Sequence, residues 1–286
     1  MKNGYCMVVS KFRLYQAVVL CKSLAAHIKQ SDTYRIFTLC MDSETYNTLL
    51  KLELVNVKLV KLKVIETDAL RMVKKERKLN EYCWTLKPFF LEYVLLRYGD
   101  LDRVTHLDAD LYFYSDPTRL FENQSQSSIL ISDHDYADIY KESEQSAGKT
   151  NSGIVSFKRN KNGIQCLRWW RDKCLEWCYE RVEGNKFSDQ RYLDEIPSLF
   201  EGVDYITTPG VNIAPWNDKK YKISLLNNEI LIDKNRLIMY HFSCYKIINK
   251  KEFLLSFGDN IPIPIIYEPY TQALEKAIND IDKLNA

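Results

Sequence analysis

Short apolar runs alternate with amphipathic segments through the first half of the chain. Runs of strand length at 5–9, 35–40 and 57–62 are separated by segments in which apolar residues recur at helical spacing, one from about 14 to 28 and one opening at a capping Ser43. Such a rhythm predicts a mostly parallel sheet covered by helices on both faces. We therefore expect an α/β fold of the nucleotide-binding kind.

The same rhythm continues through the middle of the chain. The pattern predicts a helix from about Pro88 to Arg97 and then an apolar strand from Arg103 that runs toward Phe113. Asp116 and Pro117 are typical of the cap and first residue of a short helix, and 128–132 reads as a further strand.

The second half is less regular. Its expected elements are a strand at 153–157, helices at 163–182 and from 188–190, two or three strands ending at 240–242, and C-terminal helices from Lys250 and Pro269. No repeat or linker divides the chain, so we expect one domain in three parts. These are a nucleotide-binding half (1–132), an acceptor half (133–249) and a C-terminal helical segment (250–286).

Composition and hydropathy limit the classes of function and location to be considered. The 286 residues include 40 basic and 38 acidic side chains, so overall charge gives no reason to expect a nucleic-acid partner. No apolar stretch approaches the roughly 18 residues of a membrane-spanning helix, and the N-terminal segment does not resemble a secretory signal. The expectation is a cytoplasmic protein, with peripheral association at the inner face of the membrane left open.

Two local features allow alternative interpretations. Cys166, Cys174 and Cys178 share a predicted helix face and fit either small core residues or a zinc site. The basic run at 74–78 fits a solvated helix face, a phosphate-facing lid or a contact with an anionic membrane.

The strand at 103–107 delivers two carboxylates to its carboxyl end, Asp108 and Asp110. Residues two apart on an extended strand point to the same side, so both could approach one ion, and the small Ala109 leaves room for a ligand. A nucleotide diphosphate is usually held by a hard cation bridged to carboxylates. In open α/β sheets, ligands bind at this end of the strands.

Several ordered motifs together resemble a known family. Val104-Thr105-His106-Leu107-Asp108-Ala109-Asp110, Thr150-Asn151-Ser152-Gly153, Ser188-Asp189-Gln190 and Tyr240-His241-Phe242 occur in the order found in glycosyltransferases of the GT-A fold, especially those of family 8. The resemblance covers roughly residues 3 to 246. It implies a Rossmann-like GT-A domain that uses a nucleotide-diphosphate sugar.

The resemblance also implies a metal and donor site. Asp108, Asp110 and His241 would bind Mn²⁺ or Mg²⁺, with the donor diphosphate completing the shell. Other donor contacts would come from Val9, Ser10, Lys87, Asn151 and Lys246. Lys246 stands in for a lysine that the family places after His and Gly in a Lys-Pro-Trp motif; here the spacing is one residue shorter and Pro-Trp is absent.

Catalytic roles follow from the same resemblance. Asp189 and Gln190 match the pair beside the transferred sugar in enzymes that retain the anomeric configuration, whereas Asp133 is the candidate base if configuration is inverted. Asn212 and Trp216 fall where relatives shape the acceptor side. Ser10, Asn151, Asp189 and Trp216 also have ordinary structural explanations as caps, a turn or a core anchor.

The expected activity is metal-dependent transfer of a hexosyl group, from a UDP-sugar in the first instance, to a carbohydrate or glycolipid hydroxyl in polysaccharide biosynthesis. One alternative is a sugar-1-phosphate nucleotidyltransferase, although the region around Val8 and Lys11 lacks the Gly-rich phosphate loop expected of one. The other is a non-catalytic scaffold that binds nucleotide sugars.

Overall fold

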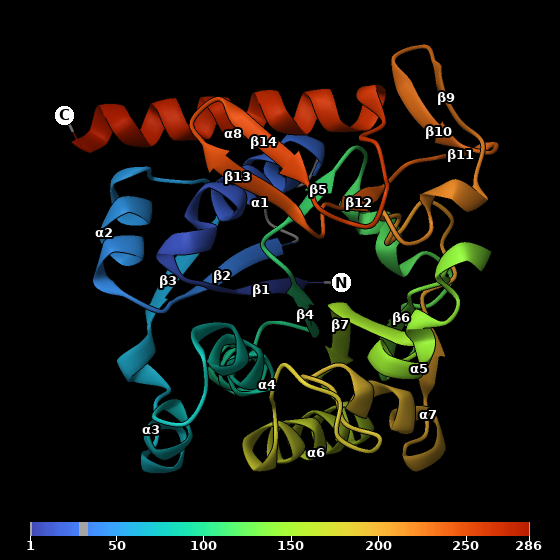
Figure 1. The fold of residues 1–286 in the computed structure, drawn as a ribbon. Coiled ribbons are helices and arrows are strands. Elements are labelled where there is room, and N and C mark those ends of the chain that lie inside the picture. The colour runs from blue at the N-terminus through green and yellow to red at the C-terminus, as the bar shows by residue number, and fades with distance from the viewer. Residues whose placement is uncertain (1, 29–33, 286) are drawn as a thin grey trace.

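A seven-stranded mixed sheet forms the middle layer of the molecule (Figure 1). The computed structural model describes residues 2–28 and 34–285. The strands lie in the order β3 (Val57–Lys61), β2 (Tyr34–Cys40), β1 (Asn3–Val9), β4 (Arg103–Leu107), β7 (Thr150–Lys158), β6 (Ile129–Asp133) and β8 (Val203–Tyr205). Strand β7 runs antiparallel to both of its neighbours, and every other pair in this sheet is parallel. The predicted α/β class is confirmed.

Helices cover both faces of the sheet (Figure 1). On one face lie α1 (Leu14–His27), α2 (Ser43–Lys51) and the long α8 (Pro264–Asn285); on the other lie α3 (Asp68–Lys74), α4 (Leu79–Arg97) and α6 (Lys161–Glu176). The short helices are α5 (Ser143–Ala147), α7 (Ile196–Leu199) and the 3-10 turns Lys11–Arg13, Leu62–Val64, Pro117–Phe121, Asp138–Tyr140, Arg191–Glu195 and Asp218–Lys220. None of the helices among the described residues is long and apolar enough to cross a membrane.

Three small antiparallel sheets complete the fold. They are β5 (Leu111–Phe113) with β12 (Met239–His241), the hairpin of β9 (Ile223–Leu226) and β10 (Glu229–Ile232) extended by β11 (Asn235–Arg236), and β13 (Tyr245–Asn249) with β14 (Glu252–Leu255). The first matters most for the site. Because Leu111 pairs with His241 across β5 and β12, the histidine lies directly beside the segment that follows β4.

Several predicted boundaries are corrected. Helix α4 begins at Leu79 rather than at Pro88, because the Glu81 side chain accepts the Lys78 N–H at 2.7 Å and so caps an earlier start. Helix α2 is capped by Asp42, whose carboxylate accepts from Thr45, and not by Ser43.

In the second half, α6 ends at Glu176 instead of continuing to Val182. The helix expected from Lys250 is the β13–β14 hairpin, and the helix expected from Pro269 begins at Pro264. The cap predicted at Asp116 is confirmed, because its carboxylate accepts the Thr118 N–H at 2.9 Å.

Burial explains the cysteine trio and one residue of the basic run, whereas Lys74, Lys75 and Lys78 of that run are exposed. Cys166, Cys174 and Cys178 are fully buried core side chains, and no cluster of metal ligands includes them within the described residues. Arg77 is also buried, and its guanidinium donates to the carbonyls of Cys174 and Leu175, each at 2.7 Å. Arg77 therefore satisfies carbonyls at the end of α6 rather than facing solvent.

Candidate active site

A cleft of about 700 Å³ opens where β1 and β4 end. Its walls come from the ends of β1 and β4 and the segments that follow them, from the first half of α4, from the start of β7, from the loop around residue 189, and from the end of β12 with the residues after it. Among the predicted site residues, those that line it are Ser10, Lys87, Asp108, Asp110, Asn151, Asp189, Gln190 and His241. The cleft therefore brings together eight side chains from separate parts of the sequence.

Two carboxylates and an imidazole converge at the floor of the cleft. Nε2 of His241 lies 3.2 Å from Oδ1 of Asp110 and 4.0 Å from Oδ2 of Asp108. One ligand atom from each of the three residues can be chosen so that all lie within 4.8 Å of one another. Burial raises the pKa of Asp110, but the neighbouring His241 outweighs that effect and the pKa lies below its usual value. Asp110 is therefore ionised at neutral pH.

These spacings fit a shared divalent ion. Two ligand atoms about 2.1 Å from one ion lie roughly 3 Å apart when adjacent and 4.2 Å apart when opposite. The separations between His241 and the two carboxylates fall within that range. Oxygen donors with one imidazole suit Mg²⁺ or Mn²⁺.

Lys87 is buried between two of the carboxylates. Its ammonium lies 3.0 Å from Asp108 and 3.1 Å from Asp189, and it donates to the Ser152 hydroxyl at 3.2 Å. Burial lowers the pKa of Lys87, but the two carboxylates outweigh burial and raise the pKa above its usual value. Asp108, Asp110 and Asp189 face this ammonium and the Arg13 guanidinium, which lies 3.8 Å from Asp110. The three carboxylates therefore still carry an excess negative charge, which favours a bound cation.

His106 lines the cleft and contacts Asp108, and the sequence analysis did not include it among the site residues. Its Nε2 lies 2.8 Å from Oδ1 of Asp108, the same oxygen that Lys87 contacts, which leaves Oδ2 facing His241 and Asp110. Burial raises the pKa of Asp108, and Lys87 and His106 reverse this effect. A signal was present, because His106 lies on β4 two positions before Asp108, and residues two apart on a strand face the same side. Asp110 lies beyond the strand, in the turn at 109–110.

Packing supports the His241 ring on the side away from its Nε2 contact with Asp110. Its Nδ1 has no hydrogen-bond partner among the described residues. Trp216, which is buried, lies edge-on to the ring with the centroids 5.1 Å apart. Gly153 borders the ring as well, since a Cβ built on Gly153 would lie 2.5 Å from Cε1 of His241.

Replacing Gly153 with alanine is therefore expected to push His241 away from Asp110. We expect Mn²⁺ affinity to fall about tenfold to a hundredfold, the usual effect of disturbing the support of a metal ligand. Electron paramagnetic resonance of free Mn²⁺ measures this directly. Gly99→Ala is the matched control because a Cβ there meets nothing within 4 Å. Equal affinity in both variants would contradict the role given to Gly153.

Asn151 and Gln190 belong to a second group of polar side chains, beside the cluster of Asp108, Asp110 and His241. The Asn151 amide donates to Nε2 of His134 at 3.3 Å, and Oε1 of Gln190 accepts from the Ser152 N–H at 3.3 Å. Burial lowers the pKa of His134 to about 3, so this imidazole is neutral and accepts from Asn151. Gln190 also donates to the Ala147 carbonyl at 2.6 Å, which fixes its amide at the edge of the cleft.

Several predicted site residues lie outside the cleft or face away from it. Val9 points into the core on the other side of β1, and Val8 lines the cleft instead, because successive strand residues face opposite sides. Asp133 ends β6 beyond the cleft lining and lies 3.6 Å from Lys149. Lys246 is exposed on the β13–β14 hairpin, and Cys244 occupies the cleft where that lysine was expected.

Of the other residues with two interpretations, Asn212 and Trp216 make structural contacts, whereas Ser10 does not. Ser10 lies in the cleft and its side chain caps no helix. Asn212 is buried and donates to the Asp133 carbonyl at 3.0 Å. Trp216 is a core anchor that reaches the site only through His241 and His134.

Solved structures identify the class of fold. The galactosyltransferase LgtC, in complex with donor and acceptor sugar analogues, superposes with a TM-score of 0.57 over 96% of each chain at 15% identity. Mouse xyloside xylosyltransferase 1 gives a TM-score of 0.51 over 85% of this chain and 98% of its own at 16% identity. The fold is that of the GT-A glycosyltransferases.

Sequence relatives then identify the family. YfnF of Bacillus subtilis (strain 168) is 41% identical over 293 residues, covering 100% of this chain and 96% of YfnF. YfnD of the same organism is 32% identical over 280 residues, covering 96% of this chain and 89% of YfnD. No family model matches the chain. The chain belongs to the family that includes the uncharacterized proteins YfnF and YfnD.

Proposed function

We propose that this protein is a metal-dependent glycosyltransferase that takes a hexosyl group from a nucleotide-diphosphate sugar. The observation that carries the proposal is the convergence of Asp108, Asp110 and His241 at the carboxyl edge of a GT-A sheet. These three residues would hold Mn²⁺ or Mg²⁺. When bound, the ion supplies positive charge that stabilises the leaving diphosphate.

The chain's own residues prepare the cleft for this chemistry. Lys87 and His106 hold one oxygen of Asp108, so that the other, which faces His241, would be free to bind the ion. Ser10 and Val8 lie at the end of β1, where the base of a UDP donor would bind. Because Lys87 is already paired with two carboxylates, its contribution to donor binding acts through them and not through direct contact with phosphate.

The arrangement favours transfer with retention of configuration. Asp133, the candidate base for inversion, does not line the cleft. Asp189 is held by Lys87, and Gln190 is fixed beside it at the same wall. We assign Asp189 an electrostatic role near the reacting carbon and Gln190 a positioning role for the transferred sugar.

The proposed acceptor is a hydroxyl of a carbohydrate or glycolipid, as in polysaccharide biosynthesis. LgtC, which shares the fold, binds donor and acceptor sugar analogues in its solved complex. The proposed setting is the cytoplasm, at or near the inner face of the membrane. All eight cysteines are free thiols, in keeping with a reducing compartment.

A screen of nucleotide sugars with Mn²⁺ tests the proposal. We expect nucleoside diphosphate release from at least one UDP-sugar, lost on addition of a chelator. Release of pyrophosphate from a nucleoside triphosphate and a sugar 1-phosphate would instead show a nucleotidyltransferase. Donor binding that ignores chelator, with no turnover, would show a non-catalytic scaffold.

A further inference from the structure

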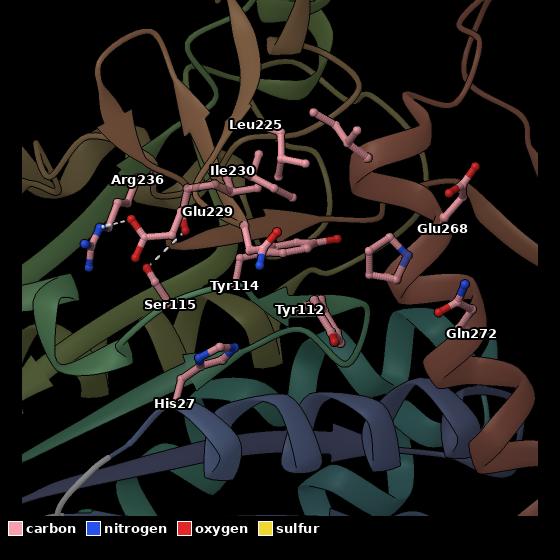
Figure 2. Close-up of a pocket in the computed structure, with 14 residues that line it drawn as sticks. His27, Tyr112, Tyr114, Ser115, Leu225, Glu229, Ile230, Arg236, Glu268 and Gln272 are labelled. Atoms are coloured by element: carbon pink, nitrogen blue, oxygen red, sulfur yellow. Dashed lines mark hydrogen bonds and ion pairs between the residues drawn. The ribbon is translucent and has the colours of Figure 1, made fainter.

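A second cavity lies away from the cleft, between the β9–β10 hairpin and the start of α8 (Figure 2). Its volume is about 430 Å³, within the roughly 300–1,000 Å³ of small-ligand pockets. It shares no lining residue with the cleft. The two are nevertheless linked by one strand, because β5 leaves the cleft after Asp110 and carries Tyr112 into the cavity wall.

Aromatic and apolar surfaces form part of this cavity. Tyr112 and Tyr114 lie edge to face with their centroids 4.9 Å apart, and Pro269 of α8 also lines the space. The Tyr114 hydroxyl bonds to the Ile266 carbonyl, which fixes that ring against α8. Rigid rings of this kind provide a flat apolar surface at low entropic cost, suited to the C–H faces of a sugar.

Polar groups with unused hydrogen-bonding capacity line the same cavity. The side chains of Asn228, Glu268 and Gln272 have no hydrogen-bond or ion-pair partner within residues 2–28 and 34–285. Glu268 and Gln272 lie one helical turn apart on α8 (Figure 2). Asn228 belongs to the turn between β9 and β10. Amide and carboxylate groups placed around an aromatic surface match the hydroxyls of a carbohydrate.

The charge of the cavity selects against anions. Arg236 and Glu229 neutralise each other at 2.7 Å, as the dashed line in Figure 2 marks. His27 is neutral at pH 7, since burial lowers its pKa below the usual value. Glu268 remains as an uncompensated negative charge, which disfavours phosphate, nucleotide or acidic-sugar ligands.

We propose that this cavity is a second carbohydrate-binding site, specific for one or two units of a neutral glycan. Its place on β5, which begins directly after the cleft residue Asp110, suits a glycan chain held at a distance from its reacting end. That use of the site rests on the proposed function. Binding of a neutral glycan in this cavity does not depend on the proposed function.

Binding of neutral disaccharides tests the site without donor or metal. The probes are maltose, cellobiose, lactose and N,N′-diacetylchitobiose at millimolar concentration, followed by backbone amide shifts of the labelled full chain. We expect at least one probe to shift amides at 225–237 and 265–272. The double variant Glu268→Ala/Gln272→Ala should weaken that probe about fivefold to tenfold, the usual effect of losing one or two hydrogen bonds.

Lys276→Ala is the matched control, because Lys276 is exposed on the same helix one turn beyond the cavity. It should bind as the wild-type protein does, and added UDP with Mn²⁺ should not compete. The inference is overturned if no probe binds, if the shifts centre on Asp108 and Asp110, or if the double variant binds as tightly as Lys276→Ala. Binding together with an inactive cleft would sink the proposed function and leave this site standing.

Discussion

Replacing Asp110 with asparagine is expected to lower Mn²⁺-dependent release of nucleoside diphosphate by roughly a hundredfold to a thousandfold. Asp110 supplies one of the two carboxylates of the cluster and lies 3.2 Å from its imidazole. Asparagine has the same shape but no charge, so it weakens attraction for a divalent ion without creating a cavity. The release assay and Mn²⁺ titration should both show the loss.

The fold should survive this change. The Asp110 side chain keeps some solvent exposure, 14%, and the backbone carbonyl that receives the Phe242 N–H is unaltered. Asp259→Asn, the same change at an exposed position between β14 and α8, should leave turnover at the wild-type rate. If Asp110→Asn also turns over normally, the carboxylate pair holds no catalytic ion.

The sequence alone predicted the part of the candidate site that is formed by residues close together along the chain. Asp108 and Asp110 follow a strand whose alternation is visible in the residues, and the carboxyl edge of a parallel sheet is where ligands gather. His106 obeys the same alternation and could have been included. Its role was missed because a buried strand histidine carries no signal of its partner.

The non-local part needed either the family resemblance or the structure. His241 reaches Asp110 only through the pairing of β5 with β12, and no periodicity near either strand reveals that pairing. The motif order placed it correctly. The same reasoning failed for Lys246, because residues after His241 form a hairpin that turns the lysine to solvent and leaves Cys244 in the cleft.

The predicted start of α4 was wrong for a related reason. Pro88 is typical of the first turn of a helix, yet α4 carries it in its interior because the chain N-terminal to it packs into the core through Tyr82 and Leu86. This earlier start places Lys87 on a wall of the cleft. Tertiary packing therefore determines both where α4 begins and where Lys87 lies in the cleft.

Replacing Lys87 with methionine is expected to lower the free energy of unfolding by roughly 3–5 kcal/mol in metal-free protein. The ammonium is the shared partner of Asp108 and Asp189, and its side chain is 5% exposed. Methionine fills similar space but leaves two nearby carboxylates without their cation. Urea unfolding monitored by tryptophan fluorescence measures the change, and Lys75→Met, at an exposed position, should cost far less.

Saturating Mn²⁺ should restore part of the stability of Lys87→Met, because an ion at Asp108 supplies some of the missing positive charge. The recovery should be incomplete, since Asp189 lies outside the three-residue cluster and loses its ion pair whatever binds beside it. Full recovery would mean that Asp189 also approaches the ion. No recovery would mean that the ion does not bind at Asp108, and the metal assignment would then fail on a measurement independent of turnover.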